Sequence, residues 1–415
     1  MSKKNKLIPE LRFPEFNNEG EWKYVNGNEL FESISNKDHD SKLPILAITQ
    51  EQGAVPREAI DYRVSVTDKS IESYKVVEIG DFIISLRSFQ GGIEYSKYLG
   101  LCSPAYIILR NRIDVKNDFY RHYFKSIPFI RDLNKNLEGI RDGKMISYTQ
   151  FSEILIPKPS KTEQQKIASC LSTLDEVIAA HNQKLELLKD HKKGLIQNLF
   201  PQKGEKVPKY RFKEFKKDGE WQKTTIDAIA KVSTGGTPES SIPEYWNGNI
   251  PWMNSGELNN KRIYSVSNFI TSKGLKESST KLIPLKCVLI GLAGQGKTRG
   301  TAAINYIELC TNQSIGSIHP NEDVFDSEFL YQRIDSMYEK LRYLSTGDGG
   351  RGGLNLQIIK EIELLLPNMR EQKKIASCLS SLDALITAQA EKIEQLKQHK
   401  KGLMQGLFPK MNYQL

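Results

Sequence analysis

Apolar residues recur at alternating spacings of four and three in two long segments of the chain, residues 163–201 and 371–409. The apolar positions of the first segment are Ile167, Leu171, Leu174, Ile178, Leu185, Leu188, Leu195 and Leu199. Those of the second segment are Ile375, Leu379, Leu382, Ile386, Ile393, Leu396, Leu403 and Leu407. A period of 3.5 residues held over such a length predicts coiled-coil helices, because a globular helix has a broader apolar face. Both segments close with Gly-Leu-x-Gln-x-Leu-Phe-Pro, so each helix should end before its proline.

The two segments are copies of one another. They begin 208 residues apart (371 − 163), and their closing prolines, Pro201 and Pro409, have the same offset. Equal length and phase predict that the helices pack on each other. The first helix leads into the residues between the copies and the second begins where those residues end, so we expect the pair to be antiparallel. The alternative is two separate amphipathic helices that lie on different cores.

Polar residues interrupt the apolar pattern at equivalent positions in the two copies. They are His181, Lys192, Gln389 and Lys400. One interpretation is that they are solvated where the helices diverge. The other is that they fix the register of the pair, as a buried polar residue does in other coiled coils.

The repeat extends beyond the helices. Residues 9–22 have a second copy at 208–221, and Cys102 and Cys310 are 208 residues apart (310 − 102). Both intervening blocks show apolar strand-like runs broken by a glycine loop, at 76–110 and 284–320. A helix-like stretch, a basic glycine-rich turn and a strand ending in proline then follow in each block. The helix-like stretches are 118–138 and 326–344, the turns are 139–144 and 347–353, and the prolines are Pro157 and Pro367.

These patterns predict a mixed α/β fold with an internal pseudo-two-fold repeat. It has two similar domains and two long antiparallel helices that form a coiled coil. We expect a first domain at 1–160, a first helix at 161–201, a second domain at 202–368 and a second helix at 369–415. A common scaffold with divergent loops is typical of two domains that recognise different sequences.

Composition narrows the class of protein. The 415 residues carry a net charge of +9, which suits a polyanionic partner. Five cysteines without C-x-x-C spacing favour reduced thiols, and six scattered histidines form no recognisable metal-binding set. No signal-peptide core or membrane-spanning run is present, so we expect a soluble cytoplasmic protein.

The paired helices, the two blocks, and the stretch STGGTPESSIPEYWNGNIPW (233–252) followed by NSGEL resemble the DNA specificity subunit of type I restriction–modification enzymes. The resemblance covers essentially the whole chain, although the first block lacks TGGTP. It implies a non-catalytic chain that reads a bipartite, asymmetric target in double-stranded DNA, with the helices acting as a ruler. It also implies two modification subunits, which methylate adenine with S-adenosylmethionine, and restriction subunits, which translocate and cleave DNA with ATP. This chain would therefore hold no cofactor, and S-adenosylmethionine, ATP and Mg²⁺ would belong to the partners.

The candidate residues follow from this interpretation. Basic and amide side chains beside glycine loops are expected to contact DNA, because lysine and arginine position a protein on phosphates while arginine, glutamine and asparagine read base edges. The candidates are Arg87, Gln90, Arg141, Lys144, Asn254, Gln295, Lys297, Arg299 and Arg351. The apolar helix positions from Ile167 to Leu188 and from Ile375 to Leu396 are expected to form the coiled coil and to dock partner subunits.

Two motifs point to a rival class, an enzyme acting on nucleic acid. GLAGQGKT (291–298) fits the phosphate-loop pattern, but such a loop needs a helix directly after it, and RGTAAINYIEL predicts a strand. Asn-Ile-Pro-Trp (249–252) imitates the catalytic tetrapeptide of amino-methyltransferases. It lacks a suitably placed cofactor loop, and we expect a structural turn in which Pro251 and Trp252 pack the block. The alternative functions are therefore a phosphate-loop ATPase or a stand-alone DNA methyltransferase.

Overall fold

The computed structural model describes residues 7–60, 68–135, 146–294, 296–344 and 353–409. The chain divides into two compact units. Unit 1 contains residues 1–182 and 391–415, and unit 2 contains residues 183–390. Each unit therefore takes one block together with parts of both long helices. The bounds of the four segments expected from the sequence stay a prediction, since the division into two compact units does not test them.

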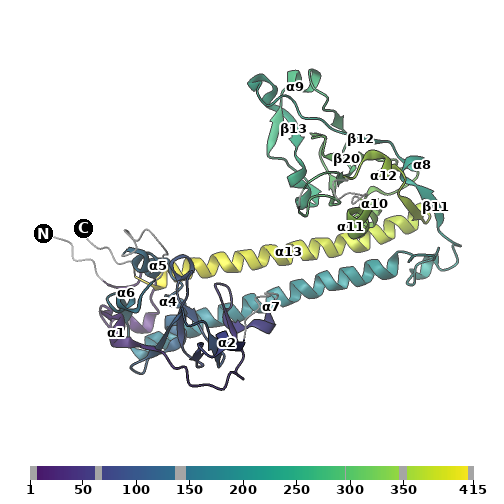
Figure 1. The fold of residues 1–415 in the computed structure, drawn as a ribbon. Coiled ribbons are helices and arrows are strands. Elements are labelled where there is room, and N and C mark those ends of the chain that lie inside the picture. Colours follow the sequence, from purple (N-terminus) through teal and green to yellow (C-terminus); the bar gives the residue numbers. More distant parts are fainter. Residues whose placement is uncertain (1–6, 61–67, 136–145, 295, 345–352, 410–415) are drawn as a thin grey trace. The chain divides into compact units, whose positions relative to one another are not determined.

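The two long helices are α7 (Lys161–Leu199) and α13 (Met369–Leu407). In unit 1, Asp175 of α7 pairs with Lys400 of α13, and Leu407 shares a buried cluster with Ile167. In unit 2 the corresponding contacts join Lys192 to Asp383 and bring Leu199 beside Ile375. An early part of one helix thus meets a late part of the other, so the segments are antiparallel within each unit, as the sequence predicts (Figure 1).

Two of the polar interruptions form these cross-helix ion pairs. The Lys400 Nζ–Asp175 Oδ1 distance is 2.5 Å, and the Lys192 Nζ–Asp383 Oδ1 distance is 2.6 Å. Because the two aspartates are 208 residues apart (383 − 175), the same pair occurs once in each copy of the repeat. Gln389 is buried as well. For these residues the structure favours the register-fixing interpretation over solvation.

The block in unit 1 combines short strands and helices. Its strands are β1 (Lys23–Asn26), β2 (Phe31–Ile34), β3 (Leu46–Thr49), β4 (Gly53–Pro56), β5 (Lys75–Val77), β6 (Phe82–Ile84), β7 (Glu94–Tyr95), β8 (Gly100–Cys102), β9 (Ile107–Asn111) and β10 (Leu155–Lys158). Its α-helices are α1 (Gly27–Leu30), α2 (Asp68–Ile71), α3 (Ser88–Gly91), α4 (Asn117–Tyr123), α5 (Ile127–Asn134) and α6 (Tyr148–Ser152). The 3₁₀ helices η1 (Pro14–Phe16) and η2 (Arg57–Ala59) complete it.

The block in unit 2 has the same kinds of element. Its strands are β11 (Gln222–Thr225), β12 (Val232–Thr234), β13 (Trp246–Met253), β14 (Arg262–Ile263), β15 (Asn268–Ile270), β16 (Leu282–Ile283), β17 (Val288–Gly291), β18 (Ala302–Asn305), β19 (Leu309–Thr311), β20 (Ile315–Ile318) and β21 (Glu363–Leu366). Its α-helices are α8 (Ile226–Ile229), α9 (Ser272–Lys276), α10 (Ser327–Ser336), α11 (Tyr338–Leu344) and α12 (Leu356–Lys360). Its 3₁₀ helices are η4 (Lys213–Phe215), η5 (Pro243–Tyr245) and η6 (Ser255–Asn260).

Strand order shows that the two blocks share one fold. The main sheet runs β2-β9-β6-β7 in unit 1 and β12-β20-β17-β18-β14 in unit 2. The pair β1–β10 corresponds to β11–β21, and both pairs are antiparallel. The antiparallel pair β5–β8 likewise corresponds to β16–β19. The mixed α/β fold with an internal repeat is therefore confirmed.

Each predicted helix-like stretch is two helices rather than one. In unit 1, α4 ends at Tyr123 and α5 begins at Ile127, with the Ser126 side chain accepting a hydrogen bond from the Phe129 backbone N–H. Pro128 lies in the first turn of α5, where its missing N–H costs nothing, and it would interrupt a continuous helix. The equivalent break in unit 2 falls at Met337, between α10 and α11.

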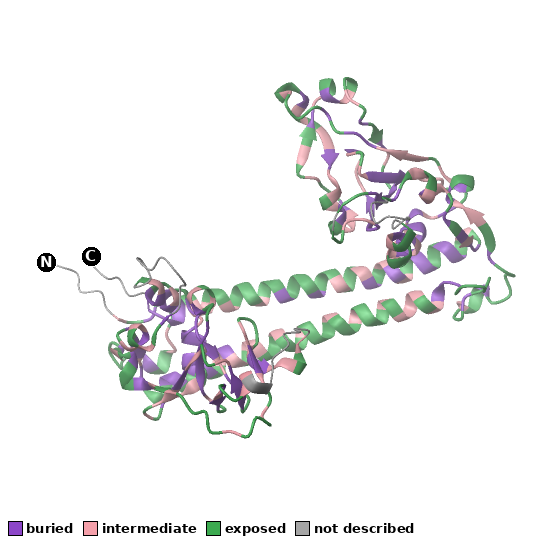
Figure 2. Ribbon diagram, viewed as in Figure 1, coloured by how far each residue is buried: buried purple, intermediate pink, exposed green. Residues whose placement is uncertain are grey.

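The closing Leu-Phe of each long helix is a core residue pair. Phe408, after α13, is buried in unit 1 with Phe119 and Tyr123, at centroid separations of 5.6 and 5.5 Å. Phe200, after α7, is buried in unit 2 and lies 5.4 Å from Phe329. In both helices the buried residues are concentrated towards the two ends, and the middle of each helix is more exposed (Figure 2). The sequence repeat that ends each helix is therefore explained by packing.

A buried ion pair joins the segment before each block to the start of a long helix. In unit 1, Arg12 donates to both carboxylate oxygens of Glu163, at 2.8 and 2.9 Å. In unit 2, Arg211 makes the same two-pronged contact with Glu371, at 2.8 and 2.7 Å. Each arginine also donates to a glycine carbonyl eight residues later. The entry segment thereby fixes the block on its helix.

Candidate DNA interface

In unit 2 the glycine loop between β17 and β18 exposes a basic side chain. The loop backbone is held by α11: the Tyr338 hydroxyl donates to the Lys297 carbonyl at 3.1 Å, and Arg342 donates to the Gly296 carbonyl. The Thr301 hydroxyl also donates to the Lys297 carbonyl, at 2.7 Å. These bonds use the backbone of Lys297 and leave its side chain exposed, whereas Arg299 is half-buried. Gln295 lies outside the described residues.

This geometry contradicts the phosphate-loop alternative. The loop closes an antiparallel hairpin in which Ile290 pairs with Ala302, so a strand follows it. A phosphate loop presents the amino-terminal amides of a helix to its ligand. In the described residues that follow the motif, the next regular element is the strand β18 and not a helix, as the sequence predicts.

In unit 1 the candidates Arg87 and Gln90 lie at the equivalent place, between β6 and β7. Both side chains are exposed, on or next to the short helix α3. The segment is held from behind: the Asn134 amide donates to the Phe89 carbonyl at 2.7 Å, and Lys125 Nζ donates to the Gly91 carbonyl at 3.0 Å. The structure thus brings the candidates of the two blocks to the same topological position.

Three further candidates, in addition to Gln295, lie outside the described residues. Arg141 and Lys144 fall in 136–145, and Arg351 falls in 345–352. The helices directly before these segments, α5 and α11, are the ones that contact the two glycine hairpins. Contact of Arg141, Lys144 and Arg351 with DNA stays a prediction.

Asn254 has a structural task. It caps η6: its Oδ1 accepts the Gly256 backbone N–H at 2.8 Å, and its own N–H donates to Glu257 Oε2 at 3.1 Å. The side-chain oxygen is therefore already engaged. Its role in reading a base stays a prediction.

The stretch 233–252 is explained by close packing. A Cβ on Gly235 or Gly236 would lie 1.8 Å from the Thr311 carbonyl oxygen or 2.1 Å from Ser279 Oγ, so neither position admits a side chain. The Trp252 indole donates to the Gly236 carbonyl at 3.0 Å. Trp252 is indeed buried, but the expected turn is wrong: Asn-Ile-Pro-Trp lies within β13, where Pro251 pairs with Phe269 of β15.

The expected coiled-coil residues fall into two groups. Ile167, Leu171, Ile375 and Leu379 are almost fully buried in the cores of their units, which leaves no surface for a partner there. Leu382 and Ile393 are also buried. The half-buried group consists of Leu174, Ile178, Leu185, Leu188, Ile386 and Leu396. Partner docking on these residues stays a prediction.

Sequence reasoning missed an aromatic residue beside the unit 2 hairpin. Tyr343 is 79% exposed at the end of α11, next to Arg342, which contacts the glycine loop. Exposed aromatic and arginine side chains are the groups on which bases stack. The signal was the pairing of both types in KLRYL, directly before the basic glycine turn.

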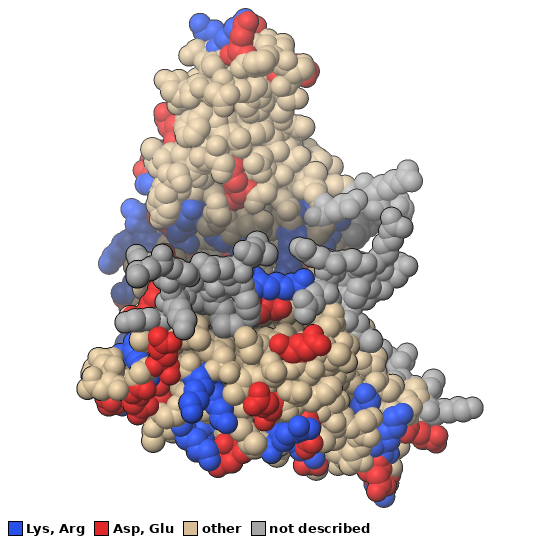
Figure 3. Space-filling model, turned by 90° about the vertical axis from the view of Figure 1, so that its left-hand side faces the viewer, with Lys and Arg blue, Asp and Glu red and all other residues tan. Residues whose placement is uncertain are grey.

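Neither the surface charge nor the cysteines identify a functional site by themselves. On the lower part of Figure 3, lysine and arginine side chains are interspersed with acidic ones, so net charge alone does not locate a DNA surface. All five cysteines are free, and burial raises the pKa of Cys102 to about 12 and that of Cys310 to about 11, so both thiols stay protonated.

The described residues contain no cluster of potential metal ligands. None of the described helices combines the length and apolar character that a bilayer crossing requires.

Comparison with known proteins identifies the family. The model of the type I restriction modification DNA specificity domain matches residues 3–190 and again residues 218–398. The chain belongs to this family, which confirms the resemblance seen in the sequence.

Individual relatives agree. The MjaVIII specificity subunit of Methanocaldococcus jannaschii is 24% identical over 96% of this chain and 93% of its own length. The MjaIX specificity subunit of the same organism is 33% identical over 46% of this chain and 44% of the relative. The EcoR124I/EcoR124II specificity subunit of Escherichia coli is 28% identical over 42% of this chain and 44% of the relative. The chain spans 60% of the length of the putative MjaX specificity subunit of Methanocaldococcus jannaschii and 44% of the length of the MjaIX subunit.

Solved structures show the same fold. The type I restriction–modification S subunit from M. genitalium covers 98% of this chain with a TM-score of 0.58 and 16% identity. A chain from a study of complex assembly and conformational transition in a type I system covers 94%, also with a TM-score of 0.58. At this identity the likeness concerns the fold alone.

Proposed function

We propose that this chain is the DNA-reading subunit of a type I restriction–modification system. The block in unit 1 reads one part of a split, asymmetric target, and the block in unit 2 reads the other. The observation that carries the proposal is that the family model matches each half separately, on two blocks that share strand order but differ in their loops. Similar scaffolds with different loops suit the recognition of two different short sequences.

In this mechanism the glycine hairpins approach the DNA. Lys297 and Arg299 in unit 2, and Arg87 and Gln90 in unit 1, supply phosphate and base-edge contacts. Backbone bonds from the neighbouring helices hold both hairpins, so the reading side chains are positioned before DNA arrives. The lengths of α7 and α13 set the number of unread bases between the two half-sites.

The chain itself performs no catalysis in this proposal. Two modification subunits bring S-adenosylmethionine and methylate adenine, and restriction subunits bring ATP and Mg²⁺ for translocation and cleavage, in the cytoplasm where the DNA lies. The strand after GLAGQGKT and the burial of Trp252 in β13 argue against nucleotide binding and methyl transfer by this chain.

The test is to map methylated adenines in cells that express the chain with its modification subunit. We expect a split, asymmetric motif. Gln90→Ala should relax or weaken one half-site and Lys297→Ala the other, since a base contact is worth about 1–3 kcal/mol. Lys217→Ala removes the same charge from an exposed position of unit 2 and should leave the motif unchanged. A continuous motif, or two variants that alter the same half-site, would overturn the proposal.

A further inference from the structure

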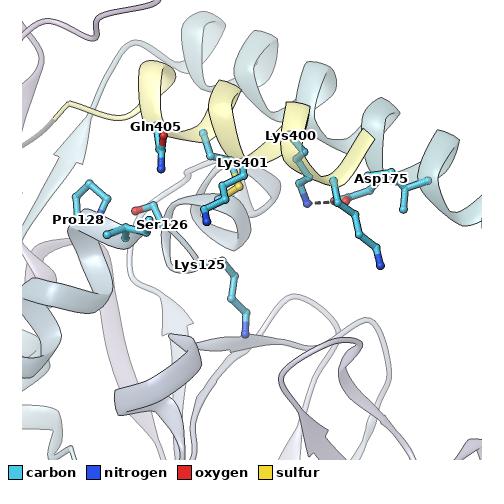
Figure 4. A pocket seen from close by; sticks show the side chains of 11 residues that line it. Lys125, Ser126, Pro128, Asp175, Lys400, Lys401 and Gln405 are labelled. Carbon is cyan, nitrogen blue, oxygen red and sulfur yellow. Dashed lines mark hydrogen bonds and ion pairs between the residues drawn. The ribbon is translucent and has the colours of Figure 1, made fainter. Parts of the chain in front are cut away.

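Unit 1 contains a pocket of about 460 Å³ that the recognition mechanism does not use. Its walls come from the turn between α4 and α5, from α7 and from α13 (Figure 4). Its apolar lining residues include Ile127, Ile178 and Met404, and we call these three residues the floor of the pocket. Ile127 is 55% exposed although it is a large aliphatic residue. Exposed apolar surface at a concave site of this kind marks a place where another molecule binds.

The rim of the pocket is cationic. Four lysines and one aspartate line it. Lys400 is paired with Asp175, and the Lys125 ammonium points away to Glu94 and the Gly91 carbonyl. Lys397 and Lys401 are exposed, and neither forms an ion pair with an acidic side chain among the described residues. Figure 4 shows Lys401 pointing into the space between α13 and the α4–α5 turn. Two cations above an apolar floor are therefore available to an incoming ligand.

In unit 2 the block contacts the equivalent aspartate more closely. There Arg262 donates to Asp383, the counterpart of Asp175, and to Glu328. The Asp383 side chain is 16% exposed, against 40% for Asp175. At the corresponding helix break, Met337 is buried whereas Ile127 is exposed. The aspartate and the helix break are therefore more buried in unit 2 than in unit 1.

We propose that this pocket binds an acidic segment of the modification subunit, with one apolar side chain on the floor and flanking carboxylates on Lys397 and Lys401. The proposal rests on the proposed function, which supplies that partner. Charge complementarity selects an acidic occupant. The apolar floor selects a protein segment over DNA phosphates, because a phosphate has no apolar group to bury there.

The occupant would lie directly behind the reading hairpin of unit 1. Lys125 forms one wall of the pocket, and its ammonium bonds the Gly91 carbonyl at the end of α3, which carries Gln90. The Lys125 side chain therefore takes part both in the docking of the modification subunit and in holding the segment that reads DNA in unit 1. This link makes the pocket a place where the partner stabilises the hairpin in its reading position.

The test measures affinity of the full-length chain for its purified modification subunit by calorimetry or sedimentation. Lys401→Glu and Ile127→Asp should each weaken binding at least tenfold, about 1.4 kcal/mol. Both positions are exposed, so thermal unfolding should be unchanged. Ile127→Leu keeps the apolar floor and should bind normally. Lys193→Glu, the repeat counterpart of Lys401 on α7, changes the same charge outside the pocket and should have little effect.

The outcomes separate the two proposals. A wild-type chain that binds no modification subunit refutes the proposed function itself. If the wild-type chain binds the modification subunit and Lys401→Glu does not change the affinity, only the pocket proposal is refuted. The same holds if Lys193→Glu weakens binding as much as Lys401→Glu does. Loss of DNA affinity in the preassembled complex, with subunit binding intact, would assign the pocket to phosphates instead. Raising the salt concentration should reduce the Lys401→Glu defect, since the contact is between charges near the surface.

Discussion

The same aspartate of the repeated helix has different neighbours in the two units. In unit 1, Asp175 lies 3.9 Å from His122 and pairs with Lys400. In unit 2, Asp383 binds Lys192, Arg262 and Gln332, the last at 2.6 Å. The helix-to-helix ion pair is common to both, while the contact from the block differs. The duplication therefore preserved the pairing of the helices and let the blocks change how they contact them.

A second difference lies at the buried arginine–glutamate pairs. In unit 1 the Trp22 indole also donates to Glu163, at 3.0 Å. In unit 2 the equivalent Trp221 indole has no partner among the described residues. Unit 1 thus concentrates three donor bonds on one buried carboxylate, and unit 2 concentrates two. This comparison predicts unequal effects from equivalent substitutions.

The largest expected effect is that of Glu163→Ala. Removing one partner of a buried ion pair costs about 3–5 kcal/mol, because the other charge stays buried. Glu371→Ala should cost a similar amount in unit 2, but Glu163→Ala should cost about 1–3 kcal/mol more, since it also leaves the Trp22 N–H unpaired. Hydrogen exchange in each unit measures the two losses separately. Equal losses would show that the Trp22 bond contributes nothing.

The second prediction concerns the phenylalanines that follow the long helices. Phe408→Ala should cost about 3–5 kcal/mol through the cavity left beside Phe119 and Tyr123. Although Phe408 is near the carboxyl end of the chain, the loss of amide protection should appear in α4 and α5 of unit 1. Phe200→Ala is the matched variant and should act on α10 of unit 2. A uniform loss across both units from either change would contradict the separate cores.

The sequence predicts the long helices better than it predicts the contacts between distant residues. The 3.5-residue period and the constant offset of 208 predicted both long helices and their antiparallel pairing, because repetition is visible along the chain. Arg12 and Glu163 are 151 residues apart, so no local pattern shows that they meet, although both are repeated as Arg211 and Glu371. The sequence predicts a turn at Asn-Ile-Pro-Trp because proline favours a turn locally, whereas pairing with β15 keeps this segment in a strand.

The candidate site was predictable only in part, for a related reason. Glycine and basic residues in sequence mark the hairpins, and the structure places Arg87 and Lys297 at equivalent positions. The amide cap of Asn254 and the exposure of Tyr343 depend on the packing of η6 and α11, which composition does not encode. The greater exposure at the pocket of unit 1 accompanies two differences. Among the described residues, Asp175 has no arginine contact like that of Arg262 on Asp383, and Ile127 is exposed where Met337 is buried.

The smallest predicted effect concerns His122, which occupies in unit 1 the position that Gln332 occupies in unit 2. Burial, followed by the nearby positive charges of Arg121, Lys400 and Lys97, lowers the pKa of His122 to about 3. Asp175 at 3.9 Å acts in the opposite direction, but desolvation and three cations outweigh one half-exposed carboxylate. The folded state therefore keeps the imidazole neutral, hydrogen-bonded to Ser172 at 3.2 Å.

The sign of the pH dependence follows from this depressed pKa. Below an unfolded pKa of about 6.5, the unfolded chain takes up a proton that the folded unit refuses. Stability of unit 1 should consequently fall as pH drops from about 6.5, by at most about 1.4 kcal/mol per pH unit from this group. His122→Gln, which installs the unit 2 residue, should remove that part of the slope in hydrogen exchange of α4 at pH 7, 6 and 5. The exposed His399→Gln should leave the slope unchanged. If His122→Gln also leaves it unchanged, the histidine is protonated in the folded unit and pairs with Asp175, so the two units would be more alike in charge than their sequences indicate.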